Sequence, residues 1–270
     1  MKTVYEKKTE LISLLSDLDS LLVAFSGGVD STFLLAVAHE ILGNRLLAVT
    51  AYSPVQPESE KRAAIGLAEQ MGVHHIVIQS QEMTLPVFTR NPADRCYHCK
   101  IQLFGLLLNM AKDKGIQCVA HGANLDDLKD YRPGLKAAKE LKIRAPLMDA
   151  GLTKADIREL SREMGLETWD KPAMACLASR IPYNTTLTVE KLAMVERAEQ
   201  LLHQLGFRHC RVRHHGDLAR IEVLPGDFSE ILREEVSANI ISQFQALGFD
   251  HISLDLEGYT QGSMNRGISV

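Results

Sequence analysis

The sequence lacks long apolar runs and any surplus of basic residues. No apolar stretch approaches the roughly 20 residues that a membrane-spanning helix needs, and the first residues, MKTVYEKKTELISLLSDL, mix charges with leucine at helical spacing instead of forming a secretory signal. The formal net charge is −4, so no general electrostatic attraction draws the chain to nucleic acid. These absences predict a cytoplasmic protein with neither a membrane nor a nucleic acid as its partner.

The chain contains five cysteines, and without a secretory signal we expect them to remain reduced. This expectation argues against a disulfide between Cys96 and Cys99, which lie in the stretch RCYHCK. Two thiols at this spacing are also typical of zinc sites, redox pairs and iron–sulfur clusters, and the stretch alone does not decide among them. The ten histidines show no H-E-x-x-H spacing, which argues against a zinc hydrolase.

The first part of the chain alternates short apolar runs with segments of helical periodicity. The runs that predict strands are Leu21–Phe25, Leu46–Thr50, His75–Ile78 and Cys118–His121. A later helix is predicted at Thr153–Gly165, because this segment starts with a capping box and ends in glycine. The alternation predicts an α/β fold with a doubly wound parallel sheet.

The character of the sequence changes around Pro172–Asn184. Beyond this point a helical segment followed by a strand-like run occurs twice, ending in CRVRHH and ISLDL, and Leu218–Val223 predicts a further strand. With 46% apolar residues the chain is long enough for two cores. We therefore expect a first domain over residues 1–180 and a smaller α+β domain over residues 181–270, serving substrate binding or oligomerisation.

The most specific motif is SGGVDS, Ser26–Ser31, between the first predicted strand and the helix after it. Its two glycines let the backbone approach a ligand closely, and the helix N-terminus presents N–H groups and partial positive charge to an anion. A plain strand-to-helix turn is the ordinary explanation of a Gly-Gly pair, but the flanking serines and the aspartate favour an anion-binding loop. The lysine of a Walker loop is missing.

This loop resembles that of the PP-loop ATP pyrophosphatases, which have an adenine nucleotide alpha hydrolase-like fold. The resemblance implies ATP cleavage between the α- and β-phosphates, with Mg²⁺ and an adenylated intermediate. It assigns ATP binding to the loop residues Ser26, Gly27, Gly28, Asp30 and Ser31. Asp30 and Ser31 are thereby also catalytic candidates, with Asp30 as the magnesium contact. The stretch Gly122–Asp127 resembles a second loop of the same fold and adds Gly122 to the ATP site.

Further segments extend the resemblance to nearly the whole chain. They are Asp130–Lys136 (DYRPGLK), Trp169–Arg180 (WDKPAMACLASR), Arg211–Arg213, Ala219–Glu222 and Gly226–Phe228. Together they are similar to the LarE family of ATP-dependent sulfur transferases. This resemblance implies adenylation of a carboxylate of a pyridinium-biscarboxylate mononucleotide and its conversion to a thiocarboxylate, in the biosynthesis of the nickel-pincer nucleotide cofactor. It also implies a homo-oligomer, while the sulfide donor stays open.

The same resemblance indicates which residues bind the anionic substrate. Arg180, Arg211 and Arg213 lie where it places the pocket, and a guanidinium group matches carboxylate or phosphate in two-point contact. On a strand, Arg211 and Arg213 project from one face with Val212 buried behind them. Solvated surface charge is the ordinary alternative. The resemblance further implies a divalent cation held by three carboxylates, Glu199, Glu222 and Asp227.

The three cysteines Cys96, Cys99 and Cys176 match a pattern found in some LarE-type proteins, whereas others carry one sacrificial cysteine. Asp94 is positioned to cap a helix over Arg95–Lys114, whose first turn carries Cys96 and Cys99 on one side. The helix N-terminus favours thiolates and so metal ligation. We expect the three thiols to hold a [4Fe-4S] cluster as the sulfur carrier, with Cys176 catalytic. A zinc site and a sacrificial Cys176 are the alternatives.

Other functions are compatible with a PP-loop. A tRNA thiolase can also carry a C-x-x-C pair, but tRNA binding requires a basic surface that the net charge of −4 does not favour. An ammonia-consuming synthetase leaves the cysteines without a role, and a nucleotide sensor does not release pyrophosphate. Sulfur transfer to a small nucleotide is therefore the preferred prediction.

Overall fold

The computed structural model describes residues 2–129, 132–172 and 175–260. The chain forms two compact units. The N-terminal unit comprises Met1–Glu82 and Asp94–Met174, and the C-terminal unit comprises Met83–Ala93 and Ala175–Val270. Among the described residues, no helix combines the length and the apolar character needed to cross a membrane.

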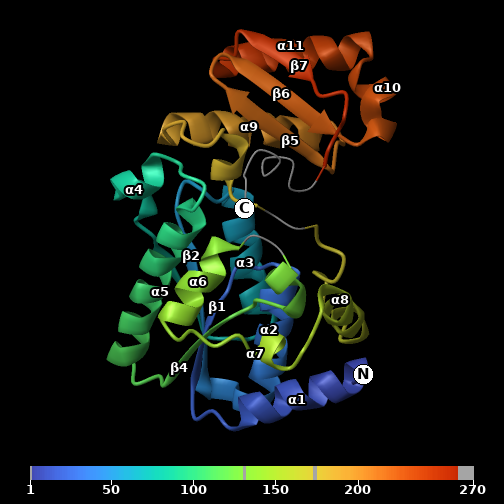
Figure 1. The fold of residues 1–270 in the computed structure, drawn as a ribbon. Helices are drawn as coiled ribbons and strands as arrows, with labels where there is room; N and C mark the ends of the chain where they lie inside the picture. The colour runs from blue at the N-terminus through green and yellow to red at the C-terminus, as the bar shows by residue number, and fades with distance from the viewer. Residues whose placement is uncertain (1, 130–131, 173–174, 261–270) are drawn as a thin grey trace. The chain divides into compact units, whose positions relative to one another are not determined.

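The N-terminal unit is built on a parallel sheet with the strand order β3-β2-β1-β4 (Figure 1). Its strands are β1 (Leu21–Ala24), β2 (Leu46–Tyr52), β3 (His75–Gln79) and β4 (Cys118–His121). The first strand lies inside the sheet, and the chain adds strands on one side of it before crossing to the other. Such a crossing is a switch point, where ligands bind beyond the carboxyl ends of the strands. The four predicted strands and the doubly wound α/β class are confirmed.

Helices cover both faces of this sheet (Figure 1). Those whose apolar residues join the core cluster on one face are α1 (Val4–Ser16), α2 (Val29–Leu42), α3 (Glu58–Gln70), α7 (Pro146–Asp149) and α8 (Lys154–Glu163). The opposite face packs against α5 (Arg95–Asp113) and α6 (Pro133–Glu140). Short 3-10 helices occur at η1 (Gly43–Arg45), η2 (Glu82–Thr84) and η3 (Leu125–Lys129). Burial on two faces explains why β1 reads as a continuous apolar run.

Helix α8 begins as the sequence predicted. Thr153 Oγ1 accepts a hydrogen bond from the backbone N–H of Asp156 at 3.2 Å, and the Asp156 carboxylate accepts one from the N–H of Thr153 at 2.8 Å. This reciprocal capping box satisfies two N–H groups that the helix cannot pair internally. It also sets Lys154 at the first helical position.

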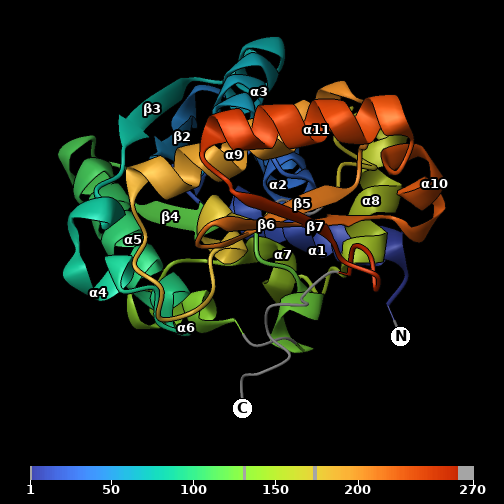
Figure 2. The same cartoon turned by 90° about the horizontal axis from the view of Figure 1, so that it is seen from above.

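The C-terminal unit contains a sheet of three strands, β5 (Cys210–His215), β6 (Leu218–Val223) and β7 (His251–Leu254), in that order. β5 and β6 are antiparallel, and β7 runs parallel to β6. The helices of this unit are α4 (Pro86–Thr89), α9 (Val189–Gln204), α10 (Phe228–Ile231) and α11 (Glu234–Leu247), with 3-10 helices η4 (Leu177–Arg180) and η5 (Pro225–Asp227). Helices α9 and α11 contact each other near the strands (Figure 2). A second, smaller α+β sheet is thus confirmed.

The segment Met83–Ala93 belongs to the C-terminal unit, although no feature of its sequence separates it from the first sheet. Asn91 attaches it there: its Nδ2 donates to the carbonyl oxygens of Ile181 at 3.0 Å and Pro182 at 2.9 Å. The Asn91 carbonyl accepts from the N–H of Asn184 at 2.9 Å. Because Asn91 is fully buried, these bonds satisfy polar groups that no water reaches.

Candidate functional site

The SGGVDS loop joins β1 to α2, as predicted, at the carboxyl end of the sheet. Gly27 has φ +69°, and a Cβ there would lie 3.1 Å from the Cα of Ala64, so only glycine fits. Gly28 occupies the N-cap position of α2. Ser31 Oγ donates to the Gly28 carbonyl at 3.1 Å and lies 3.1 Å from Ser26 Oγ. These contacts hold the loop in one shape before any ligand arrives.

Gly122 brings the end of β4 against this loop. A Cβ on Gly122 would lie 2.8 Å from the backbone nitrogen of Ser31 and 3.1 Å from the carbonyl carbon of Asp30. The close approach therefore requires glycine at this position. The structure thus brings Gly122 together with the SGGVDS loop, as the sequence predicted.

Asp30, in the first turn of α2, forms an ion pair with Lys154, the first residue of α8. The Lys154 ammonium lies 2.7 Å from Asp30 Oδ2. Burial raises the pKa of the Asp30 carboxyl, and the Lys154 charge opposes that rise. The N–H of Lys154 donates to Asp126 Oδ2 at 2.9 Å, so the second loop also positions this lysine.

A second lysine contacts the SGGVDS loop directly. Lys171 Nζ donates to the Gly27 carbonyl at 3.1 Å and to Glu60 Oε2 at 2.8 Å. The Arg158 guanidinium donates to the carbonyls of Lys171 and Trp169, each at 2.9 Å, and so braces the segment that carries the lysine. Lys154 and Lys171 supply positive charge beside a loop that contains no lysine.

Sequence reasoning missed both lysines. Lys154 follows a capping box that was recognised, and Lys171 lies inside the segment WDKPAMACLASR that carried the family resemblance. Their roles depend on contacts across more than one hundred positions of the chain, which no local pattern records.

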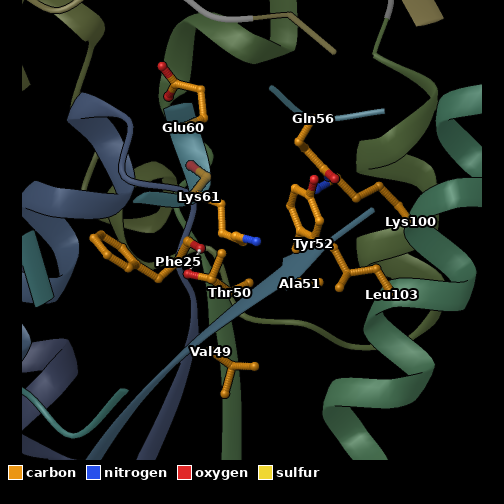
Figure 3. Close-up of a pocket in the computed structure, with 12 residues that line it drawn as sticks. Phe25, Val49, Thr50, Ala51, Tyr52, Gln56, Glu60, Lys61, Lys100 and Leu103 are labelled. Atoms are coloured by element: carbon orange, nitrogen blue, oxygen red, sulfur yellow. Dashed lines mark hydrogen bonds between the residues drawn. The ribbon is translucent and has the colours of Figure 1, made fainter. Parts of the chain in front are cut away.

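A pocket opens beside the loop at the carboxyl ends of β1 and β2 (Figure 3). Apolar and aromatic groups line one part, including Phe25, Val49 and Tyr52, while Lys61 and Lys100 add charge. Lys61 Nζ lies 4.0 Å from the centroid of the Tyr52 ring and 2.7 Å from Glu58 Oε1. The lining also contains Glu60, whose carboxylate is paired with Lys171. An apolar cavity with two lysines in its lining, next to an anion-binding loop, suits a nucleotide.

Helix α5 begins at Arg95 and carries Cys96 and Cys99 in its first turn, as predicted. Asp94 occupies the N-cap position but makes no capping hydrogen bond with its side chain; its Oδ2 lies 3.3 Å from His98 Nε2 instead. Cys96 is exposed and Cys99 is half-buried. The predicted helix is confirmed, whereas the predicted cap bond is wrong.

Cys176 is half-buried and directly precedes η4 in the C-terminal unit, whereas Cys96 and Cys99 belong to the N-terminal unit. Within the described ranges, no three His, Cys, Asp or Glu side chains form a group that could hold a metal ion. The iron–sulfur cluster on these three cysteines therefore stays a prediction. Cys210 is a buried thiol whose burial raises its pKa to about 12.

Two of the predicted substrate arginines form two-point ion pairs with two of the predicted metal ligands. Arg180 Nε and Nη2 donate to Glu199 Oε1 and Oε2, both at 2.9 Å. Arg213 Nε and Nη2 donate to Glu222 at 2.9 and 2.7 Å. Burial alone would lower the pKa of Arg180, but the Glu199 carboxylate outweighs it and holds the pKa above its usual value.

Arg211 lies on the same face of β5 as Arg213, and Val212 is fully buried behind them, as predicted. Arg211 Nη1 donates to the Cys210 carbonyl at 2.6 Å, and the guanidinium lies 5.1 Å from the centroid of the Tyr259 ring. Burial and the neighbouring Arg180 charge lower the pKa of Arg211.

The remaining predicted positions are placed as follows. Asp227 ends η5, and its role as a cation ligand stays a prediction. Asp130 and Tyr131 of DYRPGLK, and Ala173 and Met174 before Cys176, lie outside the described residues.

Known proteins are similar to this chain over both the N-terminal and the C-terminal unit. A family described as NAD synthase matches residues 14–94. A protein of Lactiplantibacillus plantarum named pyridinium-3,5-bisthiocarboxylic acid mononucleotide synthase is 38% identical, covering 98% of this chain and 96% of its own length. An uncharacterised protein of Synechocystis is 43% identical over 97% of this chain and 98% of its own. The tRNA-specific 2-thiouridylase of Rickettsia conorii is 27% identical over 61% of this chain and 54% of its own.

The match to the Lactiplantibacillus synthase covers 98% of this chain and therefore spans both units. This chain therefore belongs to the LarE family of PP-loop enzymes, which are AMP-forming sulfur transferases.

Proposed function

We propose that this enzyme adenylates a carboxylate of a pyridinium dicarboxylate mononucleotide and converts it to a thiocarboxylate, in the biosynthesis of the nickel-pincer nucleotide. The observation that carries the proposal is the preformed loop Ser26–Ser31 beside a pocket, in a chain that aligns almost end to end with a synthase of a pyridinium bisthiocarboxylic acid mononucleotide. We also expect a homo-oligomer in the cytoplasm.

The chemistry proceeds in two displacements. A substrate carboxylate oxygen attacks the α-phosphorus of ATP, and pyrophosphate leaves. A hydrosulfide sulfur then attacks the acyl carbon, a proton is released, and AMP leaves with the original carboxylate oxygen. Adenylation is needed because it turns a poor oxygen leaving group into AMP.

The SGGVDS loop is the proposed pyrophosphate site. Backbone N–H groups at the start of α2 face the phosphates, because helix N-termini bind anions. Asp30 fits a magnesium contact, since carboxylate oxygen is the ligand class that Mg²⁺ prefers. When ATP and Mg²⁺ bind, we expect Lys154 to leave Asp30 and Lys171 to leave Glu60, each exchanging a carboxylate for a phosphate oxygen.

Arg180, Arg211 and Arg213 are the proposed contacts of the anionic substrate. Arg180 and Arg213 already hold the buried carboxylates of Glu199 and Glu222, so their positions are fixed before the substrate binds. A divalent cation at Glu199, Glu222 and Asp227 remains part of the proposal, and it requires the two glutamates to release their arginines.

Cys96, Cys99 and Cys176 are the proposed ligands of a [4Fe-4S] cluster. Their thiols fit such a group chemically, since none of the three is fully buried and two share one helical turn. Held by these three thiols, the cluster would supply a carrier for the sulfide that is transferred. The protein then need not consume its own cysteine.

Three measurements test this function. Pyrophosphate release from ATP that depends on the pyridinium dicarboxylate mononucleotide supports it, whereas release that depends on tRNA favours a tRNA thiolase. For the cluster, anaerobic protein reconstituted with iron and sulfide should absorb in the visible range. A Cys96→Ala/Cys99→Ala double variant that still transfers sulfur while Cys176 becomes dehydroalanine would establish the sacrificial mechanism instead.

A further inference from the structure

Helix α5 contributes both to the nucleotide pocket and to the thiol pair. Lys100 and Leu103 line the pocket from this helix (Figure 3). Cys96 precedes Lys100 by four positions, and Cys99 precedes Leu103 by four. Residues four apart on a helix lie on one face with Cβ atoms about 5–6 Å apart. The two thiols therefore continue, one turn further, the wall formed by the two pocket residues.

The Lys100 ammonium is available to an anion in that pocket. It lies 5.4 Å from the centroid of the Phe104 ring, and within the described part of the chain it enters no ion pair. Figure 3 shows Lys100 reaching into the pocket from α5 and Lys61 entering from the opposite side. Lys61 differs because it is paired with Glu58 at 2.7 Å.

The backbone around Lys100 leaves little freedom for its stem. A Cβ on Gly134, in the first turn of α6, would lie 3.1 Å from Lys100 Cγ and 3.8 Å from the Cys96 carbonyl oxygen. Helix α6 thus packs directly on the turn that joins Cys96 to Lys100. The stem of Lys100 and the backbone of Cys96 therefore both pack against the start of α6.

We propose that Lys100 binds a phosphate of the nucleotide, and that the thiols of Cys96 and Cys99 consequently open onto the occupied nucleotide pocket. This inference rests on the proposed ATP site and adds a residue that contacts the nucleotide. The thiols of Cys96 and Cys99 and the adenylated carboxylate of the substrate would then meet on one face of α5. The bound nucleotide then covers the thiols, which an adenosine without phosphate does not do.

The test measures alkylation of Cys96 and Cys99 by iodoacetamide. Full-length protein, freed of metal by a chelator and kept reduced, is treated with and without α,β-methylene-ATP, and peptides are quantified by mass spectrometry. Binding of the nucleotide is measured in parallel by calorimetry. We expect saturating nucleotide to slow alkylation about fivefold or more and adenosine to leave the rate unchanged, as a phosphate-anchored ligand implies.

Variants separate the role of Lys100 from general pocket effects. Lys100→Met should bind the nucleotide about tenfold more weakly, the loss expected for one charge-assisted hydrogen bond, and should lose the protection at saturation. Lys100→Arg should keep it, and Lys112→Met, the matched control, should also keep it, because Lys112 is an exposed lysine in the last turn of the same helix and does not line the pocket. Thermal melting verifies that each variant is folded.

The outcomes distinguish this inference from the proposed function. If the nucleotide binds wild type but alkylation is unchanged, or if Lys100→Met is protected like wild type, the inference is overturned and the ATP site stands. If the nucleotide does not bind wild type, the ATP site and the inference are both overturned.

Discussion

Replacing Lys171 by methionine tests whether this lysine takes the place of the missing Walker lysine. The ammonium donates to the Gly27 carbonyl at 3.1 Å and to Glu60 at 2.8 Å, with both side chains of the ion pair 20% exposed. A hydrogen bond to a charged group contributes about 1.5–3 kcal/mol. If this interaction passes to a phosphate in the transition state, its loss lowers kcat/KM for ATP about 10- to 150-fold.

The assay is pyrophosphate release at saturating pyridinium substrate and varied ATP. Lys2→Met is the matched control, because Lys2 forms an exposed ion pair with Glu10 at 3.1 Å and contacts no part of the loop. The control should match wild type. A folded Lys171→Met protein with kcat/KM for ATP within about twofold of wild type would refute the assignment of Lys171 to the phosphates.

Three further predictions follow from the same contacts. Asp30→Asn should abolish pyrophosphate release. Because burial raises the pKa of Asp30, wild type loses stability as the pH rises from about 4 through that pKa, whereas the variant does not. The melting temperature of the variant relative to wild type should therefore increase over this pH range, and a constant difference would contradict the argument. Arg211→Ala should weaken binding of the pyridinium mononucleotide by about 2–5 kcal/mol with little change for ATP, measured by calorimetry, and equal losses for both ligands would place Arg211 elsewhere. Gly122→Ala should lower the free energy of unfolding in urea by about 1–3 kcal/mol, because the new Cβ would lie 2.8 Å from the backbone nitrogen of Ser31. The control Gly66→Ala, inside α3 with open space around the new Cβ, should not destabilise the protein. Similar effects of the two substitutions would argue against close packing at Gly122.

The strands and the loop were predictable because their signals are local. A buried parallel strand needs a continuous apolar run, as in Leu21–Ala24, and a phosphate-type loop needs glycine where the backbone turns, as at Gly27 with φ +69°. Both requirements are met within a few residues. The start of α5 at Arg95 was predictable for the same reason.

Other features depend on contacts between distant segments. No periodicity in the sequence indicates that Asn91 hydrogen-bonds Ile181 and Pro182, so the placement of Met83–Ala93 was missed. The pairing of Arg180 with Glu199 is of the same kind: each residue was assigned a role separately, although the structure joins them in one buried ion pair. Charge partners of this type follow from the fold and are not recorded in local spacing.

The most direct test of the central claim is the mass of the nucleotide product. Anaerobic enzyme reconstituted with iron and sulfide is incubated with ATP, Mg²⁺, sulfide and the pyridinium dicarboxylate mononucleotide, and the product is analysed by mass spectrometry. We predict a product in which sulfur replaces a carboxylate oxygen, formed together with stoichiometric AMP and pyrophosphate. Release of AMP and pyrophosphate with no sulfur in the nucleotide would contradict the assignment of this enzyme as its sulfur transferase.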